Sequence, residues 1–140
     1  MARDWRHSIK SGTKSKPAKA ERSAVSLDPL IAFCRKLPHA TEDVKWGNDL
    51  VFSIGGKMFA VFDKAGGTNF SLKTTPALFS ILTKTAGITP APYVARYHWI
   101  MVEGPEVLPK EEIEELIRES YHLVSLALPA RIRRQLAASS

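Results

Sequence analysis

The side chains that most often carry out chemistry are few in this chain and lie far apart in it. His7, His39, His98 and His122 include no pair with a metal-ligand spacing. Cys34 is the single cysteine, so the chain can form neither an internal disulfide nor a cysteine-based metal cluster. We therefore expect no catalytic residues, no metal and no cofactor, and a protein that is not an enzyme.

A second group of side chains is better suited to recognition than to catalysis. Large aromatic residues alternate with cations near the predicted loops, and this combination can stack bases and hold phosphates. The candidate binding residues are Trp46, Lys57, Lys73, Tyr93, Arg96, His98 and Trp99. An alternative stays open, in which the aromatic residues fill the core under a helix and Lys57 is only solvated at a turn.

The positive charge of the chain is concentrated at its two ends. The formal net charge is +6, but residues 1–22 hold seven Lys or Arg against two Asp or Glu, and residues 131–140 add three Arg. Residues 23–130 carry ten basic and twelve acidic side chains. A basic isoelectric point is a common argument for nucleic-acid binding, and here it comes from the ends and not from the segment expected to fold.

Composition separates a tail from a domain. Residues 1–25 are rich in Lys, Ser, Gly and Pro and bury too little apolar surface to offset their ordering entropy, so we expect a disordered basic tail, either solubilising or reaching phosphates. Residues 26–137 then form a single domain. No apolar run approaches the roughly 18 residues that span a bilayer, and the N-terminus has no signal-peptide core. These features predict a cytoplasmic protein with no membrane partner.

Residues 45–62 predict a β-hairpin. Two runs rich in Val, Ile and Phe flank Gly55-Gly56, and a two-residue turn with positive φ at both positions preserves the twist of the strands. Simple pairing across this turn predicts three opposed pairs of residues: Ile54 with Lys57, Phe52 with Phe59, and Leu50 with Val61. One face would then carry Leu50, Phe52, Ile54, Phe59 and Val61, and the other Val51, Ser53, Met58, Ala60 and Phe62. Because both faces are mostly apolar, we expect helices to cover one and a partner or ligand the other.

The remaining elements complete an α+β pattern. We expect a first helix, capped by Asp28 and ended by Pro38, and a strand over residues 69–73. A second helix should begin at Thr75-Pro76 and end at Gly87. Its inward side chains are Leu78, Ile81 and Leu82. A loop over 89–93, a strand over 97–103, a helix over 109–128 and a basic helical turn or two over 130–137 follow. This order predicts a two-layer sandwich, with an antiparallel sheet and helices packed on one face.

The ordered set of motifs resembles the MmcQ/YjbR family over roughly residues 27–136. The matching positions are Glu42, Trp46-Gly47, Phe52, the turn Gly55-Gly56-Lys57-Met58-Phe59, Leu72-Lys73, Pro76, Pro90, Tyr93, His98-Trp99 and the helix from Ile113 to Leu128. The resemblance implies a fold like the type III secretion-chaperone and frataxin-like sandwiches, and a DNA-binding "double-wing" module. Ala77 departs from the family, whose members commonly have an acidic residue there.

Two kinds of non-enzymatic binding module therefore stay open. The first binds DNA without sequence preference, through phosphate contacts of the hairpin tip and the basic ends. The second is a chaperone-like or small-ligand-binding domain that uses an aromatic pocket over Pro90–Trp99, and its partner is a small molecule or a protein segment. The slightly acidic segment between the ends favours the second, and the family resemblance favours the first.

Overall fold

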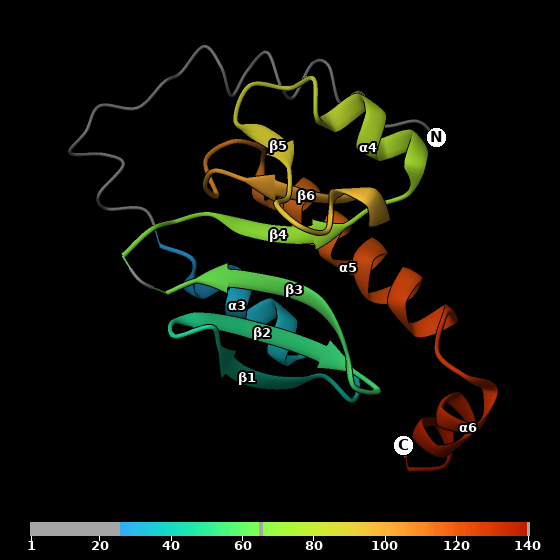
Figure 1. Cartoon of the computed structure of the whole chain (residues 1–140). Helices are drawn as coiled ribbons and strands as arrows, with labels where there is room; N and C mark the ends of the chain where they lie inside the picture. The colour runs from blue at the N-terminus through green and yellow to red at the C-terminus, as the bar shows by residue number, and fades with distance from the viewer. Residues whose placement is uncertain (1–25, 65, 140) are drawn as a thin grey trace.

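The fold is a two-layer α+β sandwich, as the sequence predicts. The computed structural model describes residues 26–64 and 66–139, so the tail expected at residues 1–25 lies outside the described residues. Figure 1 shows one sheet with β2 and β3 in front of α3, and β4 in front of α5. Among the described residues, no helix is long and apolar enough to cross a membrane.

The sheet has six strands, in the order β1-β2-β3-β4-β6-β5, and every neighbouring pair is antiparallel. The elements are α3 (Asp28–Arg35), β1 (Thr41–Lys45), β2 (Asp49–Ile54), β3 (Lys57–Asp63), β4 (Phe70–Lys73), α4 (Pro76–Leu82), β5 (Ile88–Pro90), η1 (Ala95–Tyr97), β6 (Trp99–Val102), α5 (Lys110–Leu126) and α6 (Ala130–Ala138). Among the described helices, α5 packs across β3 and β4, α3 lies beside α5 behind β2 and β3, and α4 packs beside β5 and β6.

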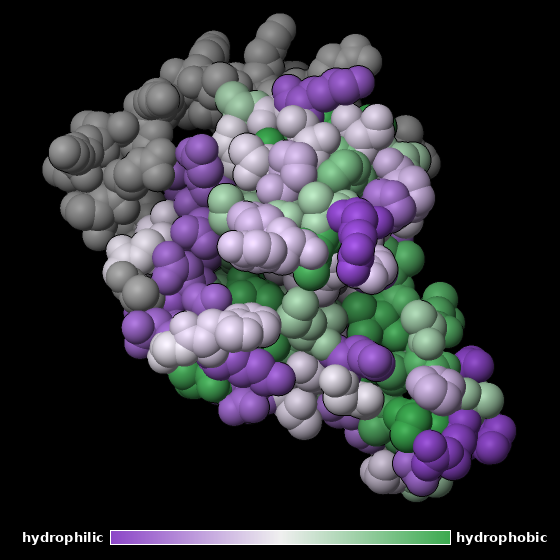
Figure 2. Space-filling view, in the orientation of Figure 1, coloured by the Kyte–Doolittle hydropathy of each residue, from purple (hydrophilic) through white to green (hydrophobic). Residues whose placement is uncertain are grey.

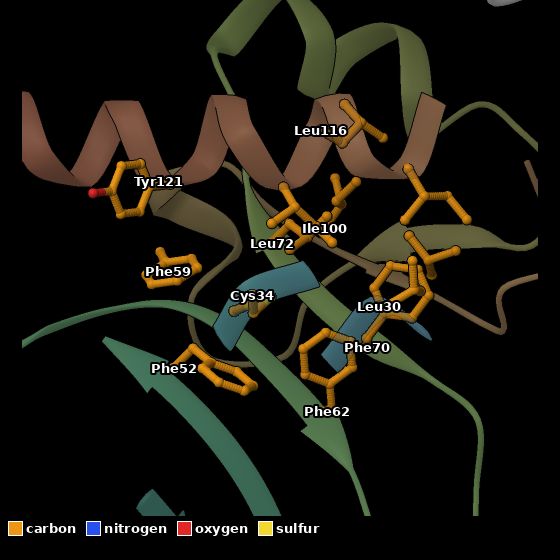
Figure 3. Packing of buried hydrophobic residues seen from close by; sticks show 14 of the residues in the cluster. Leu30, Cys34, Phe52, Phe59, Phe62, Phe70, Leu72, Ile100, Leu116 and Tyr121 are labelled. Atoms are coloured by element: carbon orange, nitrogen blue, oxygen red, sulfur yellow. The ribbon is translucent and has the colours of Figure 1, made fainter. Parts of the chain in front are cut away.

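Interlocking aromatic rings join the sheet to the helix layer (Figure 3). Phe62 contacts Phe52 edge-on at 5.9 Å between ring centroids and stacks on Phe70 at 5.7 Å. Phe59 meets Tyr121 of α5 edge-on at 5.3 Å, and the Tyr121 hydroxyl donates a 2.6 Å hydrogen bond to the Pro38 carbonyl. The core therefore ties α5 both to the hairpin and to the segment between α3 and β1.

The predicted hairpin forms, but its register differs from simple pairing. Ile54 lies opposite Lys57, whereas Phe52 lies opposite Ala60 and Leu50 opposite Phe62. A β-bulge between Phe52 and Ser53 leaves Phe59 as an extra residue in β3. The predicted pairs of Phe52 with Phe59 and Leu50 with Val61 are therefore wrong. The bulge changes the alternation of faces, because it brings both Phe59 and Phe62 into the core.

The Ser120 hydroxyl completes the hydrogen bonding at this bulge. Ser120 lies on α5 and is fully buried. Its Oγ donates a 2.6 Å hydrogen bond to the Phe59 carbonyl and accepts one of 3.0 Å from the Lys73 backbone N–H. A helix side chain thus bridges β3 and β4 just beyond their last paired residues, Ala60 and Leu72. Without it, two backbone polar groups would be left without these partners in the interior.

Several local expectations also need correction. The helix α3 begins at Asp28, which is not its cap, and the Asp28 N–H bonds instead to the Ser26 hydroxyl at 3.0 Å. Thr75 does cap α4, but that helix ends at Leu82 and not at Gly87, and Ile81 is half exposed. Strands β1 and β5 form where the sequence predicted no strand, because the edges of an existing sheet supply their hydrogen-bond partners. Tyr97, predicted to begin a strand, instead ends the 3₁₀ turn η1, and the strand β6 begins at Trp99.

Helix α6 packs against the hairpin tip. Leu128 and Ile132 approach the Gly55 backbone so closely that a Cβ added there would lie 2.6 Å from Leu128 Cδ1. Gly55 and Gly56 have positive φ of 59° and 85°, as the turn prediction requires. The C-terminal basic segment is therefore a nine-residue helix placed at the same end of the sheet as Lys57.

We predict that Ser120→Ala destabilises the fold by about 2 kcal/mol, because it leaves a buried N–H and a buried carbonyl without this partner. The matched control is Ser125→Ala on the same helix, where the hydroxyl has no hydrogen-bond partner among the described residues. Its effect should stay within roughly 0.5 kcal/mol. Urea unfolding measures the free energy of unfolding of both variants. If Ser120→Ala and Ser125→Ala lower it equally, the bridge does not stabilise the bulge.

Candidate functional site

A groove of about 590 Å³ lies on the sheet face opposite α3 and α5. Its lining residues come from the β1–β2 turn, the strands β2, β3, β4 and β6, and the segment after β5: Trp46, Asp49, Met58, Val61, Asp63, Asn69, Ser71, Ala91, Pro92, Tyr93, Val94, Trp99 and Met101. Figure 2, in the orientation of Figure 1, shows hydrophobic side chains exposed in the middle of this face. The sheet therefore has an apolar surface that none of the described helices covers.

Two exposed aromatic residues stand at the rim of the groove. Trp46 is 66% exposed and Tyr93 is 98% exposed, while Trp99 is only 5% exposed and forms part of the wall. Trp46 and Tyr93 both have a positive φ, 50° and 69°. This conformation is uncommon for residues other than glycine, although His39 and His98, which do not line the groove, have it as well. Large aromatic side chains held at the surface on strained backbone indicate a binding site.

Two carboxylates lie at one end of the groove. Asp49 begins β2, and the bulged register sets it directly opposite Asp63 at the end of β3. The Asn69 amide donates a 3.2 Å hydrogen bond to Asp63 Oδ2. Burial, and then the negative charge of Asp63, raise the pKa of the Asp49 carboxyl above its ordinary value. This end of the groove therefore suits hydrogen-bond donors and positive charge.

The candidate cations lie at the opposite end of the sheet. Lys73 Nζ donates a 2.9 Å hydrogen bond to the Tyr97 carbonyl, and the Arg96 guanidinium lies 4.9 Å from the centre of the Tyr97 ring. The His98 ring packs edge-on against Phe79 at 5.5 Å, and its carbonyl accepts hydrogen bonds of 2.9 Å and 2.7 Å from Thr74. Lys57 is exposed at the hairpin tip.

The structure thus divides the seven predicted site residues into two groups. Trp46, Tyr93 and Trp99 meet in the groove, whereas the four polar residues do not line it. Sequence reasoning missed Asp49 and Asp63, because unbulged pairing places Phe62 opposite Asp49. The one available signal was that both acids flank the hairpin at nearly equal distances from its turn.

Within the described residues, no group of three or more His, Cys, Asp or Glu side chains could hold a metal ion. Cys34 is fully buried in α3, and burial raises the pKa of its thiol to about 12. A thiol with so high a pKa is a poor nucleophile at neutral pH. What the site offers is shape, aromatic surface and negative charge.

The fold and the groove define a small α+β sandwich domain with one sheet face open. The chain belongs to the YjbR family, whose profile matches residues 35–123. The Deinococcus radiodurans protein DR2400, which has the domain DUF419, superposes with a TM-score of 0.72 at 28% identity, over 82% of this chain and 90% of that one. A Pseudomonas syringae protein superposes with a TM-score of 0.59 at 26% identity, over 71% of this chain and 99% of that one. No curated protein matches the chain.

We predict that Asp49→Asn makes the fold slightly more stable at neutral pH. The raised pKa means that the folded state binds the Asp49 proton more tightly than the unfolded chain does, so the ionised carboxylate opposes folding above that pKa. The gain should be below about 1 kcal/mol, because solvent screens the pair. It should disappear near pH 3, where both states of the wild type are protonated.

Thermal unfolding of the two proteins at pH 7 and at about pH 3 measures this difference. Asp43→Asn is the matched control, because Asp43 is exposed on β1 and the change is the same. The groups around Asp49 are Asp63 on β3, Asn69 before β4 and Lys45, which stands opposite Asp49 in the β1–β2 register. A loss of stability at pH 7 would mean that Lys45 outweighs Asp63 at this position.

Proposed function

We propose that this protein is a non-enzymatic binding module that holds a small ligand with a flat, apolar body in the groove. The observation that carries the proposal is the convergence of Trp46, Tyr93 and Trp99, from three separate segments, around the open sheet face. Aromatic walls bind flat ligands by stacking and by removing apolar surface from water. The volume of about 590 Å³ lies in the range typical of small-molecule sites.

The floor of the groove supports this assignment. Met58 and Val61 of β3 and Met101 of β6 line the groove on the open face. Methionine side chains adapt to the shape of a ligand, and sulfur packs favourably against aromatic rings. Apolar side chains on a face that no element of the described structure covers are more useful for binding than for folding. A floor of this kind fits a ligand that is aromatic or aliphatic over most of its surface.

Fluorine NMR with fluoroindole as the probe tests the proposal. The free probe gives one sharp resonance, which should broaden and shift when the protein is added. Trp46→Ala should weaken the affinity about fivefold to tenfold, because a stacking surface at the rim is lost. Tyr97→Ala is the matched control, since Tyr97 is a half-exposed aromatic residue outside the groove. Equal effects of both variants, or no broadening with wild-type protein, would contradict the groove assignment.

A second candidate function, non-specific DNA binding, is favoured by the basic end of the sheet. Lys57 begins β3 and Lys73 ends the antiparallel β4, so both lie at the same end. Helix α6 packs on the hairpin tip there and adds the exposed Arg131 and Arg134. These cations could contact phosphates, while the exposed acidic side chains of α5 would be repelled.

We predict that changing both Arg131 and Arg134 to Gln lowers the salt dependence of DNA binding. If each arginine contacts one phosphate, the slope of log K against log[salt] should become shallower by about two, alike for unrelated duplexes. The matched control is Arg118→Gln on α5, where the guanidinium lies over the Phe33 ring. Fluorescence anisotropy from low to physiological salt gives the slopes. If the slope is unchanged, Arg131 and Arg134 do not contact DNA phosphates.

A further inference from the structure

The edge strand β1 is exposed over its whole length. It is the outermost strand of the sheet beside β2, as Figure 1 shows, and all of its residues are exposed, with Val44 at 62%. The Val44 N–H donates a 3.0 Å hydrogen bond to the carboxylate of Asp43, its neighbour in the chain, so this N–H points away from β2. An edge strand with outward backbone groups can pair with a further strand.

The side chains of β1 divide between the two faces of the sheet. The register sets Lys45 opposite Asp49, which lines the groove, and Val44 opposite Leu50, which belongs to the core. Directly opposed residues of an antiparallel pair lie on the same face, and neighbours along a strand alternate. Asp43 and Lys45 therefore lie on the open face and Val44 on the helix face. Along its free edge, β1 has opposite charges on either side of an exposed apolar residue.

We propose that β1 pairs with β1 of a second copy of this chain, antiparallel and about a two-fold axis at Val44. This register sets Val44 opposite its own copy and, on each side of it, Asp43 of one chain opposite Lys45 of the other. The outward N–H of each Val44 then donates to the Val44 carbonyl of the second chain. The interface is separate from the groove, and the inference does not depend on the proposed function.

Charge selects this register from its neighbours. The two nearest registers that also keep the side chains on matching faces are centred on Asp43 and on Lys45. Each of them sets like charges directly opposite each other, which destabilises a strand pair. The register centred on Val44 instead forms two pairs of opposite charge and packs an exposed valine against its copy. Charges on an edge strand usually prevent association, and here their order permits one pairing.

The pairing joins two six-stranded sheets edge to edge. Because opposed residues share a face, the open faces of both copies lie on the same side of the joined sheet, and so do the two grooves. Trp46 at the rim of each groove directly follows β1, so the interface lies next to both sites. Since the strand is short and the contact small, we expect a weak dimer that forms at high protein concentration.

Analytical ultracentrifugation of the full chain tests this inference, because the average mass should rise with concentration. Asp43→Lys should weaken self-association about tenfold, since it turns both opposite-charge pairs of the dimer into repulsive ones. Glu111→Lys is the matched control, because it makes the same change of charge at an exposed position of α5. It should leave self-association unchanged, and equal losses in the two variants would contradict the pairing through β1.

A mixture of two charge variants identifies the register. Lys45→Asp alone should also lose self-association, because it sets aspartates opposite each other. In an equal mixture of Lys45→Asp and Asp43→Lys, each lysine of one chain faces an aspartate of the other. We expect this mixture to associate about as strongly as the wild type, although neither variant associates by itself. No association in the mixture would overturn the inference.

A backbone variant provides a readout that does not depend on charge. Val44→Pro removes the outward N–H, which an edge strand tolerates, and it should abolish self-association while the far-UV circular dichroism stays the same. Val44→Ala is the matched control, because it shortens the side chain and keeps the N–H. It should retain most of the self-association, and a loss as large as that of Val44→Pro would mean that backbone pairing does not join the copies.

The competing occupant of this edge is a segment of the same chain from residues 1–25, which lie outside the described residues. Amide hydrogen exchange separates the two occupants. Pairing with a second copy should make the protection of the Val44 N–H increase with protein concentration. Protection that does not change with concentration, in a protein that stays monomeric, would assign the edge to the chain itself and overturn the dimer. Neither result changes the expected binding of fluoroindole in the groove.

Discussion

The bridge that Ser120 makes between β3 and β4 is the interaction on which the arrangement of the sheet depends. The bulge at Phe59 puts one extra residue into β3, and the buried Ser120 hydroxyl bonds to the Phe59 carbonyl and the Lys73 N–H. Because backbone polar groups cannot be left unpaired in an interior, the bulge and the helix residue require each other. The longest helix is therefore coupled to the hairpin by hydrogen bonds as well as by apolar packing.

The bulge has consequences on both faces of the sheet. On the helix face, it allows Phe59 and Phe62 to enter the same aromatic core, where their rings meet those of Tyr121 and Phe70 (Figure 3). On the open face, it brings Val61 into the groove and sets Asp49 opposite Asp63. One inserted residue thus decides both how the core packs and which side chains line the candidate site.

The groove also shows where the structure departs from its local preferences. Trp46 and Tyr93 have left-handed backbone conformations that most residues avoid, and two acids oppose each other at the end of the hairpin. Neither feature improves the stability of the fold. Departures of this kind are expected at functional sites, although the left-handed conformation also occurs at His39 and His98, which do not line the groove. The YjbR family and the two similar solved structures agree with this fold.

The sequence by itself determined the class of the fold, the family, the turn at Gly55-Gly56 and most of the long helix, because these depend on local signals such as periodicity, capping and turn chemistry. It also gave Trp46, Tyr93 and Trp99 as candidate binding residues, which the structure brings together in the groove, but it grouped them with cations that do not line the groove. The edge strands β1 and β5 were not predicted, because all of their side chains except Ile88 are exposed and leave no apolar alternation, so only the hydrogen bonds to β2 and β6 make these segments strands. Only the tertiary structure decided the hairpin register, because the bulge is completed by a hydroxyl from a helix about sixty residues later in the chain. The opposition of Asp49 and Asp63, and with it the negative end of the groove, follows from that register and could not be read from either strand alone.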